Sequence, residues 1–315
     1  MARPERSRRA SVVLVTWNSA PWLPRCLAGI AQQSWPDVEL IVVDNASSDG
    51  SAEHATIRNA ENRGFAAAVN QGIAASRGEF VMLCNPDAFL EPGYIARIVE
   101  ALDEAGESFG MATGKLLSAD DGNVIDSKGI RMTRTGRHLD IEQGQPNNPI
   151  TEQPKEVFGV SGAAAIYRKT FLDDVAIDGQ PFDEDFFAYR EDADIAWRGR
   201  LFGWRALYVP NAVAYHVRAV TPEKRRQISS AINMHSVKNR FLLRLKNEGL
   251  YLALRNAPFE LLRDLIAIAA TLTIERTSLP AFTWIWRNRK RVLAKRRAIQ
   301  SRRRVSDREL ARWFR

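Results

Sequence analysis

The sequence predicts an α/β fold in which a mostly parallel sheet carries helices on both faces, followed by a helical, basic C-terminal extension. Three observations lead to this prediction. Short apolar, largely β-branched runs alternate with segments of helical periodicity between residues 11 and 113. A polar loop follows each of these strand-like runs, and beyond residue 229 the pattern becomes helical throughout.

Length and cysteine content indicate a globular protein with free thiols. The chain has 315 residues, 45% of them hydrophobic, which is enough for a large core and excludes disorder throughout. Its two cysteines, Cys26 and Cys84, lie in apolar patterns that are typical of buried free thiols. The N-terminus lacks the apolar segment of a signal peptide. We therefore expect a cytoplasmic protein without disulfide bonds.

The net charge of +8 comes from the C-terminus. Residues 287–315 hold thirteen Lys and Arg against two acids, a local balance of +11, so residues 1–286 carry a net charge of −3. A basic tail of this kind can bind RNA, DNA or an anionic membrane surface, and composition does not choose among them.

The composition divides the chain into three parts. They are a basic N-terminal tail at residues 1–10, an α/β domain at residues 11–228, and a helical region at residues 229–315 that ends in the Arg-rich tail. The longest uncharged runs of the helical region, 265–274 and 277–286, have ten residues each. A helix needs about twenty to cross a bilayer, so we expect this region to lie on a membrane surface instead of spanning it.

The first half of the α/β domain gives the clearest elements. Strands are predicted at residues 11–15, 38–43 and 80–84. Helices are predicted over residues 23–30 and 65–76, the second bounded by Gly64 and Gly78. The carboxyl ends of parallel strands share one edge of a sheet, where small ligands bind. We therefore expect the polar loops after these strands to line a binding site.

The second half is less regular. Residues 114–154 are rich in Gly, Asp, Asn and Pro and predict a long loop or a small antiparallel insertion. Ser161 and Gly162 interrupt an apolar stretch at a point where a ligand can approach the backbone. A helix is predicted from residue 191 to 202, and a last strand over residues 204–216.

Asp87 and His216 are the candidates for a metal site. Asp87 follows the third strand, and a lone carboxylate there suits Mg²⁺ or Mn²⁺, which take oxygen ligands from protein and from substrate phosphates. His216 lies in an apolar, strand-like segment, and imidazole is acceptable to Mn²⁺ but less expected for Mg²⁺. The structural alternatives are a turn residue at Asp87 and a core histidine at position 216.

Polar side chains after the second strand suit a nucleotide. Asp44 and Asn45 can form hydrogen bonds with a base or a ribose. Asn62, Gly64 and Asn70 place amides around a backbone that can approach a diphosphate. Each of these residues taken alone is also a common turn residue.

An acid-rich segment precedes the helix predicted from residue 191. Glu191 and Asp192 lie at its N-terminus, where the helix dipole favours carboxylates for purely structural reasons. Aromatic residues surround the acids of residues 183–194, and an apolar setting raises the pKa of a carboxyl group towards that of a useful general base.

Five motifs, in this order and spacing, resemble family 2 glycosyltransferases, and specifically their bacterial rhamnosyltransferase branch. The motifs are Val-Thr-Trp-Asn-Ser at 15–19, Val-Val-Asp-Asn-Ala-Ser-Ser-Asp-Gly-Ser at 42–51, Asn-Arg-Gly-Phe-Ala-Ala-Ala-Val-Asn-Gln-Gly at 62–72, Asn-Pro-Asp at 85–87 and Tyr-Arg-Glu-Asp-Ala-Asp at 189–194. The resemblance covers about residues 11–218. It implies a GT-A fold, a nucleotide-sugar donor, a divalent cation and inversion at the anomeric carbon.

The resemblance also implies roles for single residues. Asp192 matches the acid taken as catalytic base, and Asp87 matches the metal-binding acid of the Asp-x-Asp motif, whose first acid is replaced here by Asn85. His216 is similar in placement to a downstream metal ligand. The donor-binding positions that the resemblance implies are Thr16, Asn18, Asp44, Asn45, Asn62, Gly64, Asn70, Asn85 and Asp87. The acceptor-binding positions are Ser161, Gly162 and Glu191.

These observations lead to one expected function and two alternatives. We expect a metal-dependent inverting glycosyltransferase that moves L-rhamnose from dTDP-rhamnose to a lipid-linked or polysaccharide acceptor in cell-surface glycan synthesis. It would lie at the inner face of the plasma membrane, held by residues 287–315, although the same tail could be a solvated or oligomer-forming helix. One alternative is a nucleic-acid-binding α/β protein that uses the Arg-rich tail. The other, a sugar-nucleotide nucleotidyltransferase, needs a Gly-rich basic loop that residues 16–19 lack.

Overall fold

The computed structural model describes residues 8–148, 152–218 and 230–315, and in this part of the chain ten strands form one mixed sheet. Its strands run in the order β10-β12-β6-β11-β4-β1-β2-β3, with β5 beside β12 and β7 beside β6. Residues 1–7 of the predicted basic tail, and the predicted boundary between residues 228 and 229, lie outside the described residues.

The strands of this sheet are β1 (Ala10–Thr16), β2 (Val38–Asp44), β3 (Ile57–Arg58), β4 (Phe80–Cys84), β5 (Ala88–Leu90), β6 (Phe109–Ser118), β7 (Ile125–Ser127), β10 (Lys155–Val157), β11 (Ala164–Arg168) and β12 (Arg205–His216). A separate pair, β8 (Ile130–Met132) and β9 (His138–Asp140), is the antiparallel insertion that the sequence predicted between residues 114 and 154.

The parallel centre of the sheet is β1 with β2 and β4 on its two sides. All seven residues of β1 are buried, because alternate side chains enter two different hydrophobic clusters. Val13 lies in the cluster under one face and Val12 in the cluster under the other. Burial on both faces explains the continuous apolar runs by which these strands were predicted.

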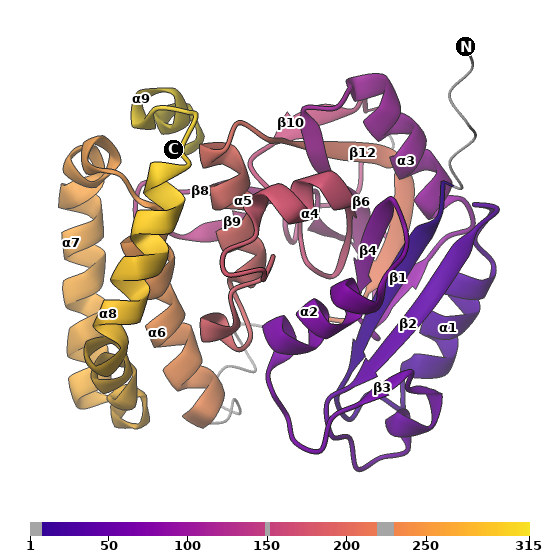
Figure 1. Ribbon diagram of the computed structural model, residues 1–315, viewed down its shortest axis with the longest axis horizontal. Coiled ribbons are helices and arrows are strands. Elements are labelled where there is room, and N and C mark those ends of the chain that lie inside the picture. Colours follow the sequence, from indigo (N-terminus) through magenta and orange to yellow (C-terminus); the bar gives the residue numbers. More distant parts are fainter. Residues whose placement is uncertain (1–7, 149–151, 219–229) are drawn as a thin grey trace.

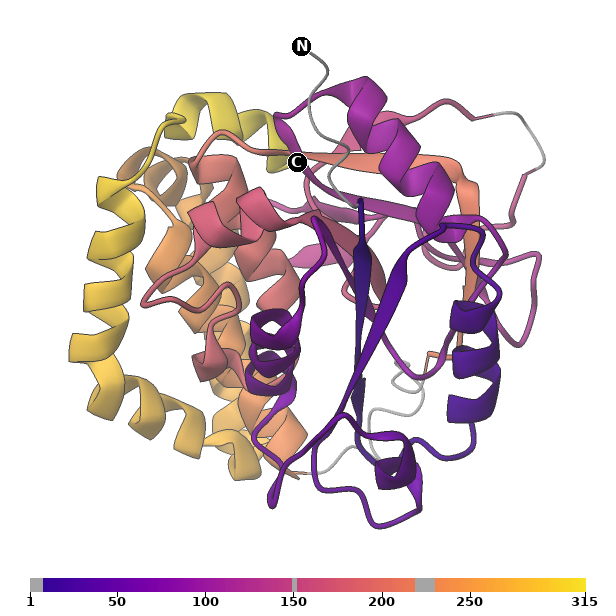
Figure 2. The same cartoon turned by 45° about the vertical axis from the view of Figure 1, so that its right-hand side comes forward.

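Helices cover both faces of the sheet, as Figures 1 and 2 show. One face carries α1 (Leu23–Ala31) and α3 (Tyr94–Ala105), and the other carries α2 (Phe65–Ala75), α4 (Lys169–Val175) and α5 (Glu191–Leu201). Figure 2 shows α2 and α1 on opposite sides of the strands. The predicted α/β architecture is therefore confirmed.

The sheet differs from a purely parallel one at β11. This strand lies antiparallel between β4 and β6, so the chain returns to the middle of the sheet after the β8–β9 insertion. The return brings Gly162 and Ala163, which precede β11, to the carboxyl end of β4, where Asn85 N donates to Ala163 O at 2.8 Å. Periodicity along the sequence carries no signal for such a crossover.

The C-terminal region consists of α6 (Ser230–Asn247), α7 (Leu250–Thr273), α8 (Pro280–Ser301) and the short α9 (Asp307–Leu310). The first three gather on one side of the molecule next to α5 (Figure 1). Of the described helices, none is long and apolar enough to cross a membrane. Phe314, the last residue but one, is fully buried against Trp197 of α5 with a ring separation of 4.9 Å.

Several cations of the Arg-rich tail pair with acids of the α/β domain. Lys295 of α8 binds Asp183 and Asp185, and Arg291 binds Asp185 at 2.6 Å. Lys246 of α6 also binds Asp183. These contacts attach α6 and α8 to the segment that leads into α5.

Candidate active site

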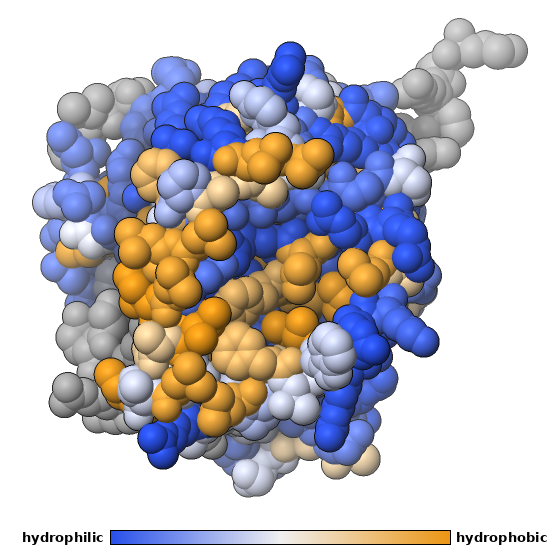
Figure 3. Space-filling view, turned by 90° about the vertical axis from the view of Figure 1, so that its left-hand side faces the viewer, coloured by the Kyte–Doolittle hydropathy of each residue, from blue (hydrophilic) through white to orange (hydrophobic). Residues whose placement is uncertain are grey.

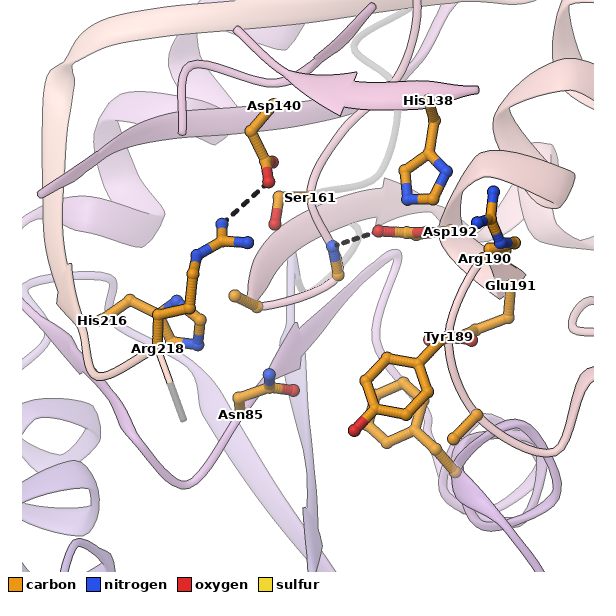
Figure 4. Close-up of a pocket in the computed structure, with 14 residues that line it drawn as sticks. Asn85, His138, Asp140, Ser161, Tyr189, Arg190, Glu191, Asp192, His216 and Arg218 are labelled. Carbon is orange, nitrogen blue, oxygen red and sulfur yellow. Dashed lines mark hydrogen bonds and ion pairs between the residues drawn. The ribbon is translucent and has the colours of Figure 1, made fainter. Parts of the chain in front are cut away.

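Two adjoining cavities open beyond the carboxyl ends of the central strands. The first, of about 460 Å³, is lined by Asn45, Asn62 and Asp87 among others, and we call it the Asp87 cavity. The second, of about 330 Å³, contains Asp192 and His216, and we call it the Asp192 cavity (Figure 4). Both share the side chains of Phe65, Asn85, Ala188 and Tyr189, so a ligand in one lies next to a ligand in the other.

The loops after β1 and β2 fix one another at the edge of the Asp87 cavity. Asp44 is buried, and its carboxylate accepts hydrogen bonds from Thr16 Oγ1 and from Ser47 N, each at 3.0 Å. Asn18 Oδ1 accepts from Ser48 N at 2.8 Å. Thr16, Asn18 and Asp44 were predicted to contact the donor, but none of them is among the described residues that line either cavity. Their hydrogen bonds instead fix the loops whose other residues line the Asp87 cavity.

Asn45 joins the second and third polar loops. Its Nδ2 donates to Asn62 Oδ1 at 2.9 Å and to the carbonyl of Gly64 at 3.2 Å, and its Oδ1 accepts from Arg63 N. Gly64 has φ +88°, and a Cβ there would lie 2.6 Å from Phe187 Cδ2, so only glycine fits. Asn45, Asn62 and Asn85 line the cavity as predicted, while Gly64 supports it from behind.

Asn70 has another position than expected. Its Nδ2 donates to the carbonyl of Phe182 at 2.8 Å, and its Oδ1 accepts from Phe182 N at 3.0 Å. It is not among the described residues that line the two cavities. The sequence analysis assigned the amide of Asn70 to the donor site. In the structure this amide instead holds α2 to Phe182, in the segment before Asp183.

Asp87 and His216, the two residues predicted as metal ligands, face each other. His216 Nε2 lies 3.4 Å from Asp87 Oδ1, while its Nδ1 lies 2.9 Å from Asp126 Oδ2. A carboxylate behind the second ring nitrogen orients many metal-binding histidines in this way. Burial acts to lower the pKa of His216, but the bonds to Asp126 and Asp87 outweigh it and raise the pKa to about 9. His216 Nε2 must lose its proton before the pair can hold a divalent cation, because the cation takes the place of that proton. A cation held there would take its other ligands from a substrate.

A group of three or more ligating side chains was not found among the described residues. Two protein ligands nevertheless agree with the replacement of the first acid of the Asp-x-Asp motif by Asn85, which lines both cavities. Hard cations that bridge a protein to phosphates commonly keep few protein ligands.

Asp192 lies in the first turn of α5 and points into its cavity (Figure 4). Its carboxylate accepts from Ala193 N at 2.7 Å and from Gly162 N at 3.4 Å. Burial raises its pKa to about 6. Burial, and then the charge of Asp192, raises the pKa of the neighbouring Glu191 to about 8. Ser161, Gly162 and Glu191 line the same cavity, as predicted.

The other acids of the segment 183–194 do not share this environment. Asp183 and Asp185 bind lysines of the C-terminal helices, and Asp194 is fully buried beside Arg198 at 3.0 Å. Opposite charges within a few ångströms favour the ionised carboxylate. The expectation of raised pKa values therefore holds for Glu191 and Asp192 but was wrong for Asp183, whose pKa lies well below its usual value.

A strained turn connects Phe187 to Asp192. Phe187, Tyr189 and Arg190 all have φ between +65° and +74°, a region that such residues rarely adopt. Asn239 of α6 compensates, since its Nδ2 donates to the carbonyls of Phe186, Ala188 and Tyr189 at 2.8 to 2.9 Å. A residue of the C-terminal region thus holds the turn that lines both cavities.

Four lining residues were missed by sequence reasoning: His138, Asp140, Arg190 and Arg218. His138 and Asp140 come from β9, inside the stretch that had no regular pattern. Arg218 donates to Asp126 and Asp140 at 2.6 and 2.8 Å, which joins the insertion to the end of β12. Burial, followed by the charges of Arg190 and Arg137, lowers the pKa of His138 to about 3. His138, Asp140 and Arg218 lie in sequence contexts that gave no signal, because the fold brings them in. Arg190 lies inside the motif at 189–194, of which only the acids were assigned a role.

Comparison with known proteins agrees with this geometry. Residues 11–176 match the family model described as Glycosyl transferase family 2. The N-acetylglucosaminyl-diphospho-decaprenol L-rhamnosyltransferase of Mycobacterium tuberculosis (strain H37Rv) is 30% identical over 238 residues, which cover 66% of this chain and 76% of that protein. The putative glycosyltransferase EpsH of Bacillus subtilis (strain 168) is 25% identical over 268 residues, covering 79% and 68%.

Solved structures share the fold at lower identity. A mannosyltransferase from Pyrobaculum calidifontis, in complex with GDP-Man and Mn²⁺, superposes with a TM-score of 0.53 at 21% identity over 95% of this chain and 85% of that one. The structure of residues 1–349 of TarS from S. aureus with UDP-GlcNAc gives a TM-score of 0.54 at 16% identity over 93% and 88%. At these identities the likeness establishes the fold alone.

Proposed function

The chain belongs to glycosyl transferase family 2 and is a glycosyltransferase, and from this premise we propose that it transfers L-rhamnose from dTDP-rhamnose to a lipid-linked acceptor with inversion at the anomeric carbon. The observation that carries the proposal is the position of Asp192. It is a buried carboxylate of raised pKa, in a cavity that adjoins the one containing Asp87. Base and donor site are thus separate but contiguous.

The nucleotide and the cation belong in the Asp87 cavity. At its edge Asn62 offers its amide nitrogen to the nucleotide, while the amide of Asn45 holds the loops together. Asp87 with His216 would hold a divalent ion. When bound, such an ion neutralises charge on the nucleoside diphosphate that leaves. The neighbours solved with Mn²⁺ support divalent metal use, without distinguishing Mn²⁺ from Mg²⁺ in this chain.

Asp192 acts on the acceptor. Its ionised carboxylate takes the proton of an acceptor hydroxyl while that oxygen attacks the anomeric carbon from the face opposite the nucleotide. The bond from the anomeric carbon to the diphosphate breaks in the same displacement, so the configuration inverts. The hydrogen bonds from Ala193 N and Gly162 N orient the carboxylate, and burial keeps its pKa close to the pH at which a general base works best.

Transfer and donor binding, measured together, test this assignment. Asp192→Asn should lower the transfer rate by a factor of about 10² to 10⁴ and leave the donor dissociation constant within about twofold, because the amide cannot accept the proton. Asp87→Ala should weaken donor binding in Mn²⁺ and not in its absence. Product with the donor's anomeric configuration, or an active Asp192→Asn enzyme, would contradict the proposal.

The enzyme also belongs, in this proposal, at the inner face of the plasma membrane. On α7, the side chains of Leu261, Leu262, Leu265 and Ile266 are 55% to 65% exposed, and Trp286 of α8 is 66% exposed. An exposed apolar face beside arginines suits the interface of an anionic bilayer. Because Lys295 and Arg291 bind acids of the protein, α7 supports this association better than the Arg-rich tail alone. Co-sedimentation with phosphatidylglycerol vesicles checks it, and protein left in the supernatant would contradict it.

Nucleic-acid binding and nucleotidyl transfer, the two alternatives, have lost their support. The family assignment gives the chain a transferase function. Several tail arginines that a nucleic acid would need are engaged within the protein, as Arg304 is with Asp174 at 2.9 Å.

A further inference from the structure

Three arginines from different elements have no partner in the part of the chain that the structure describes. Arg190 precedes α5, Arg240 lies on α6 and Arg263 lies on α7. Three of their side-chain nitrogens are buried without a hydrogen-bond acceptor: Arg190 Nη1, Arg240 Nε and Arg263 Nε. We call these three residues the arginine cluster.

Their neighbours on the same helices have ion pairs or hydrogen bonds, although Arg244 also has a buried Nε without an acceptor. Arg244 of α6 binds Glu260 at 3.0 Å and also Asp264, and Arg255 of α7 donates to the carbonyls of Ala311 and Phe314. The charges of Asp192 and Asp264 favour the ionised forms of Arg190 and Arg240, respectively, but Asp264 is already bound to Arg244. A buried guanidinium nitrogen without an acceptor costs free energy. The cluster can therefore accept a further anion.

Contacts of adjacent residues bring the three arginines together. Asn239, next to Arg240, donates to the carbonyl of Tyr189, next to Arg190, and Asp264, next to Arg263, binds Arg244 of α6. Arg190 lines the Asp192 cavity, while Arg240 and Arg263 line a cleft of about 250 Å³ between α6 and α7. Burial, and then the charges of Arg240 and Arg137, lowers the pKa of Arg190 to about 10. Burial and the charge of Arg263 lower the pKa of Arg240. Such mutual repulsion marks a place where an anion of more than one charge binds favourably.

The cluster has polar and apolar surroundings. The Asp192 cavity contributes carboxylates and amides. The cleft between α6 and α7 is lined by Asn233, Ser236, Thr271 and Glu275 as well as by Ile266, Ala267 and Ala270, and α7 also carries exposed leucines. Figure 3 shows apolar side chains gathered on one face of the molecule.

We propose that Arg190, Arg240 and Arg263 bind a diphosphate group, and that this group is the diphosphate joining the sugar of a lipid-linked acceptor to its hydrocarbon chain. The order sugar, diphosphate, hydrocarbon then follows the order Asp192 cavity, arginine cluster, α7 face. Planar guanidinium groups bind phosphate oxygens in pairs, so three of them can meet both phosphates. This inference rests on the proposed function for the identity of the ligand, although not for the existence of an anion site.

The first test uses inorganic pyrophosphate and the full-length protein in EDTA, which removes divalent cations from the donor site. Isothermal titration should show binding that falls at least tenfold in Arg240→Gln and in Arg263→Gln. Arg289→Gln, an exposed arginine of α8, is the matched control and should bind like the unaltered protein. Equal pyrophosphate affinity in all four proteins would overturn the site.

The second test separates the site from the proposed function. With short-chain sugar-diphosphate-lipid acceptors, Arg240→Gln and Arg263→Gln should raise the acceptor KM at least tenfold and leave the donor dissociation constant unchanged. An uncharged alkyl glycoside of the same sugar should show no difference between the variants and the unaltered enzyme. An unchanged KM for the diphosphate acceptor refutes the acceptor role while transfer itself stands. Pyrophosphate binding that depends on both arginines, without any sugar transfer, keeps the anion site and refutes the proposed function.

Phospholipid headgroups are the other source of phosphate. If the two substitutions reduce binding to phosphatidylglycerol vesicles and leave pyrophosphate binding and the acceptor KM unchanged, the cluster is a headgroup site and the inference fails. Unchanged vesicle binding with a raised acceptor KM supports it.

Discussion

At the scale of single residues, the environment of a carboxylate decides its chemistry in this protein. Asp183 and Asp192 lie nine residues apart in one acid-rich segment, yet the pKa of the first is lowered by two lysines and that of the second is raised by burial. Only the second can exchange a proton near neutral pH. The composition of the segment is the same for both, and the difference comes from α6 and α8, which are distant in sequence.

The pKa of Asp192 leads to an expected pH dependence. The carboxylate must be ionised to accept a proton, so the transfer rate at saturating donor and acceptor should rise with pH, about tenfold per unit below pH 6, and level off above it. A profile of the transfer rate between pH 4.5 and 8 measures this rise. Asp192→Asn should remove it, and a flat profile for the unaltered enzyme would contradict the role of Asp192.

Residue patterns predicted the site unevenly, for a physical reason. Asn45, Asn62, Asp87 and Asp192 follow or begin regular elements, and the ends of parallel strands converge, so their positions follow from the chain order. Asn70 was assigned to the donor site, but its side chain binds Phe182 instead. The sequence of a helix does not show which of its polar side chains face a ligand. His138 and Arg218 had no signal, since β9 reaches the site through an irregular insertion.

At the scale of elements, the turn between Phe187 and Asp192 depends on α6. Three residues of this turn have positive φ, and such conformations cost about 1 to 3 kcal/mol each unless their surroundings hold them. Asn239 supplies that support through the three carbonyls that it binds. The turn lines both cavities, so a change in its shape alters both of them.

We expect Asn239→Ala to lower the transfer rate at least tenfold and to reduce the free energy of unfolding by about 1 to 3 kcal/mol, because buried carbonyls lose their donor. Asn288→Ala is the control, since Asn288 on α8 donates only to Trp284 O, one turn earlier in the same helix. Kinetics and thermal unfolding of both variants measure the difference. Equal activities would show that the turn keeps its shape without Asn239.

At the scale of the whole molecule, the C-terminal helices are part of the folded unit. Val292 and Ile299 of α8 are buried in the same cluster as side chains of β1 and α2, and Phe314 packs against Trp197 of α5. The sequence predicted these helices and their charge correctly. It did not predict that the charges face acids of the α/β domain, because an amphipathic pattern does not identify its partner.

Removal of one of these charges should destabilise the protein over a defined pH range. Lys295→Met leaves Asp183 and Asp185 buried with fewer cations, and we expect a loss of about 2 kcal/mol, below the usual cost of breaking a buried pair because Lys246 remains. Lys290→Met, an exposed lysine of the same helix, is the control and should lose little.

The sign of the pH dependence follows from the two partners. The pKa of Asp183 is lowered in the folded protein, so its stabilising contribution is present above its unfolded pKa of about 4 and is lost as the pH falls further. The pKa of Lys295 is raised, so its contribution is present below about pH 10 and is lost above that value. Urea unfolding at pH 7 and at pH 3 should show the difference between the two proteins shrinking in acid, and a constant difference would contradict the pairing.

The contacts of Asp183 and Asp185 with α6 and α8 also limit how this enzyme can be recombined with its relatives. A chimera that exchanges residues 230–315 alone would place foreign side chains opposite two buried carboxylates and would remove Asn239 from the strained turn. A functional exchange has to carry the segment 182–194 along with the C-terminal helices. The part that has to be exchanged as a whole is therefore discontinuous in the chain, although it is continuous in space.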